Sequence, residues 1–134
     1  ENAENFMQIR SQRWLFDALF PGKQLLFVCR YPQENLENLR SWLLRIPNRY
    51  VHFGDFDLAG VHIYLSEIYA HLGNRSSFLV PSDIEERLAE GNAALYNQQY
   101  ARFRNMAVTD IRLQPLVNMI HHYRRGYEQE GYIR

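Results

Sequence analysis

Two aspartates one residue apart follow a short apolar stretch, in the sequence Gly54-Asp55-Phe56-Asp57-Leu58-Ala59-Gly60. If the chain stays extended there, residues at i and i+2 point to the same side, so Asp55 and Asp57 can aim both carboxylates at one point. Carboxylate oxygens are the hard ligands that Mg²⁺ and Mn²⁺ prefer, and these ions in turn hold phosphate oxygens. The alternative is an ordinary turn, because aspartate and glycine are common loop residues and a short motif needs context.

Apolar runs separated by helical patterns predict a parallel sheet that positions this pair. Strands are expected at 24–30, at about 50–53 and at 77–80, and the first run lacks alternation, as in strands covered on both faces. Helices are expected at 2–20, 35–44, 59–72, 83–90, 93–104 and 114–125. Parallel strands need crossover connections, and ligands of open α/β sheets bind at the carboxyl ends of strands, where the two aspartates fall.

The sequence therefore predicts an α/β fold in three layers, a Rossmann-like parallel sheet with helices on both faces and a C-terminal helical addition. We expect a single domain over residues 1–134, with an α/β core over 1–81 and a mostly helical extension over 82–134. The chain starts at Glu1 rather than at a methionine and leads directly into a helical pattern. We interpret it as a C-terminal fragment of a longer protein.

The composition is that of a globular domain, with 46% hydrophobic residues and 15 acidic residues balanced by 15 basic ones. The overall charge thus does not indicate nucleic-acid binding, and any nucleic-acid contact must come from a local group of basic residues. The one cysteine, Cys29, excludes an intramolecular disulfide and is expected to be a core residue, in keeping with a reducing cytoplasm. With no signal peptide and no apolar run of membrane-spanning length, we expect a cytoplasmic protein without membrane contact.

Three motifs, taken together, resemble those of Toprim domains, which occur in topoisomerases, primases, recombination nucleases and the topoisomerase VI A subunit. Glu1-Asn2 resembles the first Toprim motif, a glutamate just before a helix, and Asp55-Phe56-Asp57 resembles the second. A late Glu128-Gln129-Glu130 completes an order that resembles the C-terminal domain of the D subunit of Wadjet anti-plasmid systems and related uncharacterised bacterial proteins. The resemblance covers most of the chain.

This resemblance implies that Glu1, Asp55 and Asp57 gather at one edge of the sheet and support Mg²⁺- or Mn²⁺-dependent cleavage of a DNA phosphodiester. Asp55 and Asp57 would hold the metal ion, and Glu1 would be a further ligand or a general base. Glu128 and Glu130 are weaker candidates for a second metal ion or for supporting its ligands. The implied protein is a bacterial defence nuclease, with DNA, subunits of an SMC-like complex and a second copy of itself as partners.

Arginines near the C-terminus are the candidates for holding DNA. Arg124 and Arg125 stand beside Glu-Gln-Glu and are expected to contact the DNA backbone, unless they merely form a solvated helix face. Gly60 would let the amide end of its helix approach a phosphate, or would only permit close packing. His52, three residues before Asp55, is expected in the core or in support of the site rather than as a metal ligand.

Two further functions remain open. A degenerate Toprim-like module would bind nucleic acid or a partner without cutting, and its carboxylates would be engaged in salt bridges with no room for a metal ion. A phosphohydrolase of small phosphoesters would use the same Asp-x-Asp pair inside a closed pocket. A nuclease needs instead an open, basic approach to Asp55 and Asp57.

Overall fold

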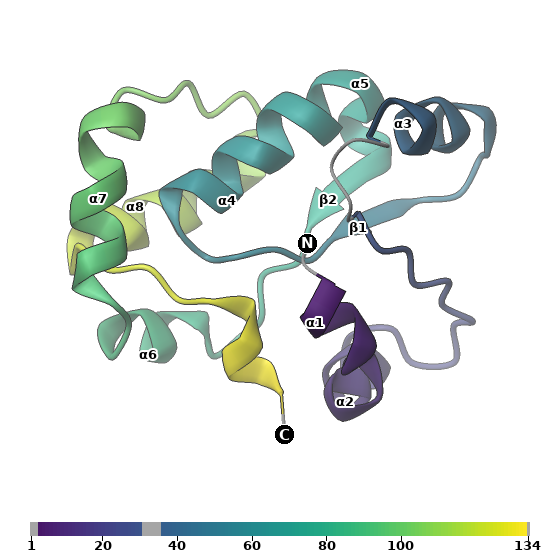
Figure 1. Ribbon diagram of the computed structural model, residues 1–134, viewed down its shortest axis with the longest axis horizontal. Coiled ribbons are helices and arrows are strands. Elements are labelled where there is room, and N and C mark those ends of the chain that lie inside the picture. The colour runs from purple at the N-terminus through teal and green to yellow at the C-terminus, as the bar shows by residue number, and fades with distance from the viewer. Residues whose placement is uncertain (1–2, 31–35, 134) are drawn as a thin grey trace.

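A two-stranded parallel sheet lies at the centre of the computed structural model (Figure 1), which describes residues 3–30 and 36–133 apart from the side chain of Asn5. Strand β1 (Tyr50–His52) pairs with β2 (Ser76–Phe78), with Val51 opposite Ser77. The backbone N–H of Leu79 extends the ladder by donating to His52 O over 2.8 Å. The expected parallel pairing of these two strands is confirmed.

One continuous helical run forms the crossover between the strands. Helix α4 (Leu58–Ile63) continues as a π-helical turn, η2 (Tyr64–Tyr69), and then as α5 (Ala70–Leu72). A 3₁₀ turn, η3 (Gly73–Arg75), leads into β2, and Gly73 adopts a φ of 54°, which a residue without Cβ reaches at little cost. In Figure 1 this run crosses above the sheet, with α3 (Leu36–Arg45) beside α5.

The N-terminal residues form two helices where the sequence predicts one. Helix α1 (Ala3–Met7) ends at Gln8, and α2 (Ile9–Leu19) follows directly and buries Leu15 and Phe16. Both helices lie below the sheet in Figure 1. They therefore cover the side opposite to the crossover.

Residues 24–30 correct the predicted fold. They are extended, but Leu25–Cys29 exchange no backbone hydrogen bond with any part of the chain that the structure describes. Their apolar run indicates burial, yet a strand also needs a neighbour to pair with, and the pattern cannot supply one. Among the residues that the structure describes, the expected three-layer Rossmann-like sheet is not evident: the domain is a mostly helical α/β fold whose described sheet has two strands.

The C-terminal half is helical, as predicted, and returns to the sheet at its end. Its elements are α6 (Ile84–Ala89), α7 (Ala93–Phe103), η4 (Ile111–Leu113), α8 (Gln114–Tyr123) and η5 (Gln129–Tyr132). Helix α7 packs on α4, and α6 packs on α8. They share one hydrophobic core with the sheet, in which Phe56, Leu88 and Ile120 are fully buried. Among the described residues, no helix has the length and apolar character needed to cross a membrane.

Candidate active site

The Asp-x-Asp segment lies just beyond the carboxyl end of β1, against the C-terminal tail. The backbone of Phe56 forms an antiparallel bridge with Tyr127, from Phe56 N to Tyr127 O at 2.8 Å and from Tyr127 N to Phe56 O at 3.1 Å. A second bridge joins Gly126 to Asn92 at the start of α7. These bridges place residues 126–132 directly against Asp55 and Asp57.

Asp55 is half-buried and binds this tail through its carboxylate. Its Oδ1 accepts a hydrogen bond from the backbone N–H of Gln129 at 2.9 Å. Because the acceptor is ionised, this bond is of the stronger kind. Glu128, which is exposed, and Glu130, which is half-buried, flank Gln129 in the chain. The bond therefore brings the backbone of the Glu128–Glu130 segment to the end of β1.

Asp57 has a different role, because it caps helix α4. Its side chain is 4% exposed, and its Oδ1 accepts from the backbone N–H of Gly60 at 2.7 Å. Its Oδ2 accepts from Gln99 Nε2 at 2.8 Å, while Gln99 Oε1 accepts from Ala59 N at 3.0 Å. Both carboxylate oxygens thus have protein partners, and the negative charge sits favourably at a helix N-terminus. Sequence reasoning missed Gln99, which only the packing of α7 on α4 brings here.

Two glycines make this close packing possible. A Cβ on Gly60 would lie 2.2 Å from the Asp55 carbonyl oxygen, and a Cβ on Gly126 would lie 2.8 Å from Asp57 Cβ. Neither position has room for a side chain. For Gly60, the close approach is to the protein's own backbone.

A divalent cation fits this place in the chemistry of its donors, which are hard carboxylate oxygens. The described residues do not complete a site, however, because nowhere in them do three or more His, Cys, Asp or Glu side chains gather to hold a metal ion. Both carboxylate oxygens of Asp57 already accept hydrogen bonds from the protein. Glu1, the third acidic residue of the predicted site, lies outside the described residues.

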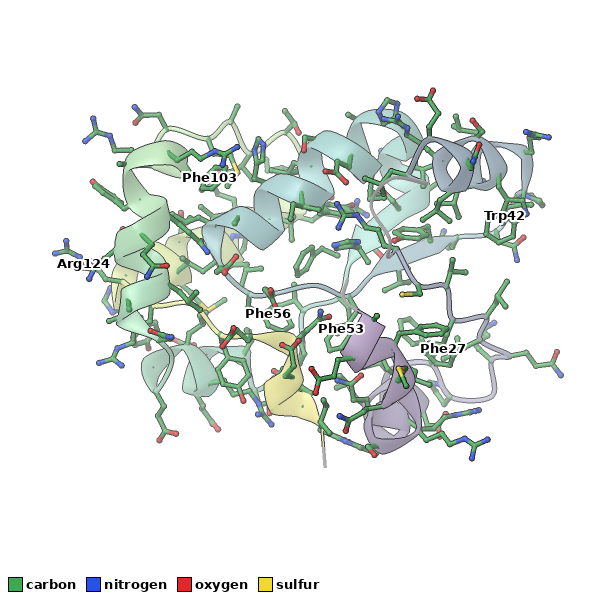
Figure 2. All side chains as sticks on the ribbon, in the orientation of Figure 1. Phe27, Trp42, Phe53, Phe56, Phe103 and Arg124 are labelled. Carbon is green, nitrogen blue, oxygen red and sulfur yellow. The ribbon has the colours of Figure 1, made fainter. Side chains whose placement is uncertain are left out.

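The predicted DNA-contacting arginines differ in their surroundings. Arg125 donates from Nη1 to Gly91 O at 2.7 Å, and so fastens the tail to the turn before α7. Arg124 is exposed and ends α8 in the left-handed region, with φ 53° and ψ 44°, which is uncommon for a residue other than glycine. Figure 2 shows Arg124 at the edge of the molecule, beyond α7 and α8.

Arg124 lines an open hollow of about 650 Å³ between α7 and α8. The other lining residues are Tyr96, Tyr100, Arg104, Asn105 and His121. Tyr96 Oη and His121 Nδ1 are hydrogen-bonded at 2.9 Å, and the Arg104 guanidinium lies 5.8 Å from the centre of the Tyr100 ring. The hollow thus combines two arginines with aromatic faces.

His52 lies in the core, among aromatic rings. Its side chain is 2% exposed, and its ring lies 5.6 Å from that of Tyr64 and 5.5 Å from that of Phe78. Burial raises the pKa of Tyr64 to about 12. The Tyr64 hydroxyl group donates to Asp110 Oδ2 at 3.1 Å, and this bond links the core around His52 to the loop before η4.

Comparison with known proteins identifies a family for the whole chain. No curated protein matches it, and no solved structure matches it. A family model described as "Domain of unknown function (DUF7281)" matches residues 1–134. The chain therefore belongs to the DUF7281 family.

Proposed function

We propose that this domain is the metal-dependent catalytic domain of a bacterial DNA nuclease, which hydrolyses phosphodiesters at the carboxyl end of β1. The observation that carries the proposal is the hydrogen bond from Gln129 N to Asp55 Oδ1, which brings the Glu128–Glu130 segment to Asp55. Carboxylate oxygens are the hard ligands that Mg²⁺ and Mn²⁺ prefer. The Toprim-like order of the acidic motifs supports the same function, with a role in anti-plasmid defence.

In this proposal Asp55 is the central ligand of Mg²⁺ or Mn²⁺. The bound ion would polarise a phosphoryl oxygen and stabilise the leaving oxygen. The Gln129 amide fixes the orientation of the Asp55 carboxylate, and Asp57 fixes the start of α4 beside it. Glu1 is proposed as a further ligand or general base. Glu128 and Glu130 are proposed to hold the ion or its ligands from the tail.

We assign DNA contacts to the hollow between α7 and α8 rather than to Arg125. Arg104 and Arg124 have no carboxylate within ion-pair distance in the described part of the chain, so their charge is available to phosphate. Tyr100 is 37% exposed and offers a face on which a base can stack. Helix α7 also carries Gln99, the partner of Asp57, so the hollow and the acidic residues share one element.

A second candidate is a module that binds nucleic acid or a partner without cutting it. Its support is Asp57, whose two oxygens are taken by Gly60 N and Gln99 Nε2. The phosphohydrolase alternative receives no such support, because neither Asp55 nor Asp57 lines the hollow between α7 and α8 or the apolar groove beside β1.

Calorimetric titration with Mn²⁺ and Mg²⁺ separates the first two functions. We expect saturable binding by the wild-type chain that is lost in Asp55→Asn and retained in Asp17→Asn. Asp17 is a matched control because it is an exposed carboxylate on α2, paired with Arg13 at 3.1 Å. Plasmid nicking in the presence of Mn²⁺ should likewise be lost in Asp55→Asn and retained in Asp17→Asn. Equal binding by wild type and Asp55→Asn overturns the metal site, and a folded wild type that binds DNA but no metal ion establishes the second candidate.

A further inference from the structure

A groove runs along the open edge of β1, between this strand and the extended residues 24–30. Its volume is about 570 Å³, and its walls are largely apolar. Six of the large side chains that line it are Phe16, Phe27, Trp42, Leu43, Ile46 and Phe53. Figure 2 labels Phe27, Trp42 and Phe53 on this side of the molecule. Phe16, from α2, packs edge-on against the rings of Phe27 and Phe53, with centroids 5.1 and 5.4 Å away.

One wall of the groove is the outer edge of β1. Along a strand, the N–H and C=O of successive residues point alternately to its two sides. The backbone C=O of His52 accepts from Leu79 N, so the backbone polar groups of His52 point to β2. Those of Val51, the preceding residue, therefore point to the groove. The far edge of the sheet is different, because there Arg112 Nη2 donates to Ser76 O at 2.7 Å. Within the described sheet, the edge of β1 is therefore open to the groove, while Arg112 covers part of the edge of β2.

The other wall is held in place by side chains instead of backbone bonds. Arg30 is buried and pairs with Glu67, with Nε 3.1 Å from Oε2, while Phe27 packs on Phe16. Between these anchors, Leu25–Cys29 make no backbone hydrogen bond within the described residues. The backbone N–H and C=O groups of this segment therefore belong to no ladder within the described residues, and they are available to pair with a further strand.

Gln129 adds polar groups to the same groove. Its side chain is 1% exposed and lines the groove, yet neither Nε2 nor Oε1 has a hydrogen-bond partner in the described part of the chain. A buried amide group without hydrogen-bond partners is energetically unfavourable. The occupant that suits this groove must therefore bring hydrogen-bonding groups as well as apolar side chains.

We propose that the groove receives one extended, apolar strand of a partner polypeptide, which joins β1 and residues 24–30 into one sheet. A strand offers apolar side chains to the walls, and backbone N–H and C=O groups to Val51, Leu25–Cys29 and Gln129. The backbone N–H and C=O groups of a helix are already hydrogen-bonded within the helix, and an alkyl chain has no hydrogen-bonding groups. Neither therefore matches both the apolar walls and the polar groups of the groove. The proposal does not depend on the metal site at Asp55.

Amide hydrogen exchange of the isotope-labelled chain, followed by NMR, tests the proposal. The probe is a short acetylated peptide of valine and isoleucine, flanked by lysines for solubility. We expect its addition to slow exchange at Val51 and at every second residue of Leu25–Cys29 by at least tenfold. The control peptide carries proline at alternate positions, which removes its donors, and should give no protection.

Two variants sharpen the test. Gln129→Met removes the buried amide while keeping an apolar side chain of similar length, and should weaken peptide binding several-fold without unfolding the chain. Asp17→Asn, on the outer face of α2, should bind the peptide as wild type does. Equal binding of the two peptides would reduce the groove to an unspecific apolar site and overturn the proposal. Protection that depends on protein concentration without peptide, together with a dimer in sedimentation, would assign the groove to a second copy and also overturn it.

Discussion

The carboxylate of Asp55 and the backbone N–H of Gln129, 74 positions apart in the chain, are joined by a hydrogen bond of 2.9 Å. This bond connects the end of β1 to the C-terminal tail at the point where both carry acidic residues. The tail is held on either side of it by the Phe56–Tyr127 bridge and by η5. Asp55 thus has a structural partner as well as a proposed chemical role, and the two roles can be separated by substitution.

Replacing Asp55 with alanine should release the tail. Gln129 N–H would lose its acceptor, and we expect a destabilisation of about 1–3 kcal/mol, together with faster exchange of this amide. Asp55→Asn keeps an acceptor oxygen, so it should retain most of the stability while losing metal binding. Urea denaturation and hydrogen exchange measure the two effects. Equal loss of stability in both variants would contradict the assigned bond.

Asp57 should matter for stability more than for metal binding. Asp57→Ala removes the N-cap of α4 and the partner of Gln99, and we expect a loss of about 1–3 kcal/mol in the free energy of unfolding. A double-mutant cycle with Gln99→Ala isolates the bond between the two side chains. We expect a coupling energy of about 0.5–1.5 kcal/mol in urea denaturation. A coupling near zero would show that Gln99 does not hold Asp57 in solution.

Adding a methyl group to Gly60 or Gly126 should be severely destabilising. The Gly60→Ala Cβ would meet the Asp55 carbonyl at 2.2 Å, and the Gly126→Ala Cβ would meet Asp57 Cβ at 2.8 Å. Backbone must shift in the first case, so we expect losses of about 3 kcal/mol or more, with a smaller loss at Gly126. Ala101→Ser, on the exposed face of α7, serves as the neutral control in thermal denaturation. A Gly60→Ala variant as stable as wild type would contradict the close packing of α4 on Asp55.

The sequence predicted the helices and the β1–β2 pair well because their signals are local. In the structure, Gly73 with its positive φ ends the crossover and Asn92 caps α7, and both residues act within a few positions. The segment 24–30 shows the limit of this reasoning. Its apolar run indicates burial, but pairing depends on a neighbouring strand, which the pattern cannot supply.

The site was predictable only in outline. The spacing of Asp55 and Asp57 locates both at the end of β1, but it does not show that Asp57 turns inward to cap α4. Gln99 and the Gln129 amide reach these carboxylates through the packing of α7 and of the tail, which no local spacing encodes. The sequence could not predict that the buried Gln129 amide has no hydrogen-bond partner in the described residues, because this depends on which residues surround it in the fold.

The hollow between α7 and α8 should account for most of the electrostatic contact with DNA. Arg104→Gln and Arg124→Asn each remove one positive charge, and asparagine tolerates the left-handed backbone of position 124. We expect each variant to weaken binding to a single-stranded oligonucleotide and to reduce the dependence of log K on log salt by about 0.7. Arg13→Gln on α2 is the control. Unchanged affinity and slope in both variants would remove the hollow from the DNA-binding surface.

Tyr64 and Asp110 should give the domain opposite pH limits. Burial raises the pKa of Tyr64 to about 12, above the value of about 10 in an unfolded chain, so its contribution to stability is complete below pH ~10 and is lost as the pH rises through 12. For Asp110, burial alone would raise the pKa, but hydrogen bonds from Arg112 and Tyr64 outweigh it and lower the pKa. Its contribution is therefore present above pH ~4 and is lost as the pH falls through the lowered value.

Tyr64→Phe should consequently reduce the alkaline part of this profile, to which the buried Tyr132 with its raised pKa also contributes, and Asp110→Asn should reduce the acidic part. The free energy of unfolding in urea, measured from pH 3 to pH 12, tests both, and Tyr100→Phe at the exposed hollow is the control. Because Tyr64 donates to Asp110 at 3.1 Å, Tyr64→Phe should also move the acid limit upward. An alkaline limit unchanged in Tyr64→Phe would show that another group controls it.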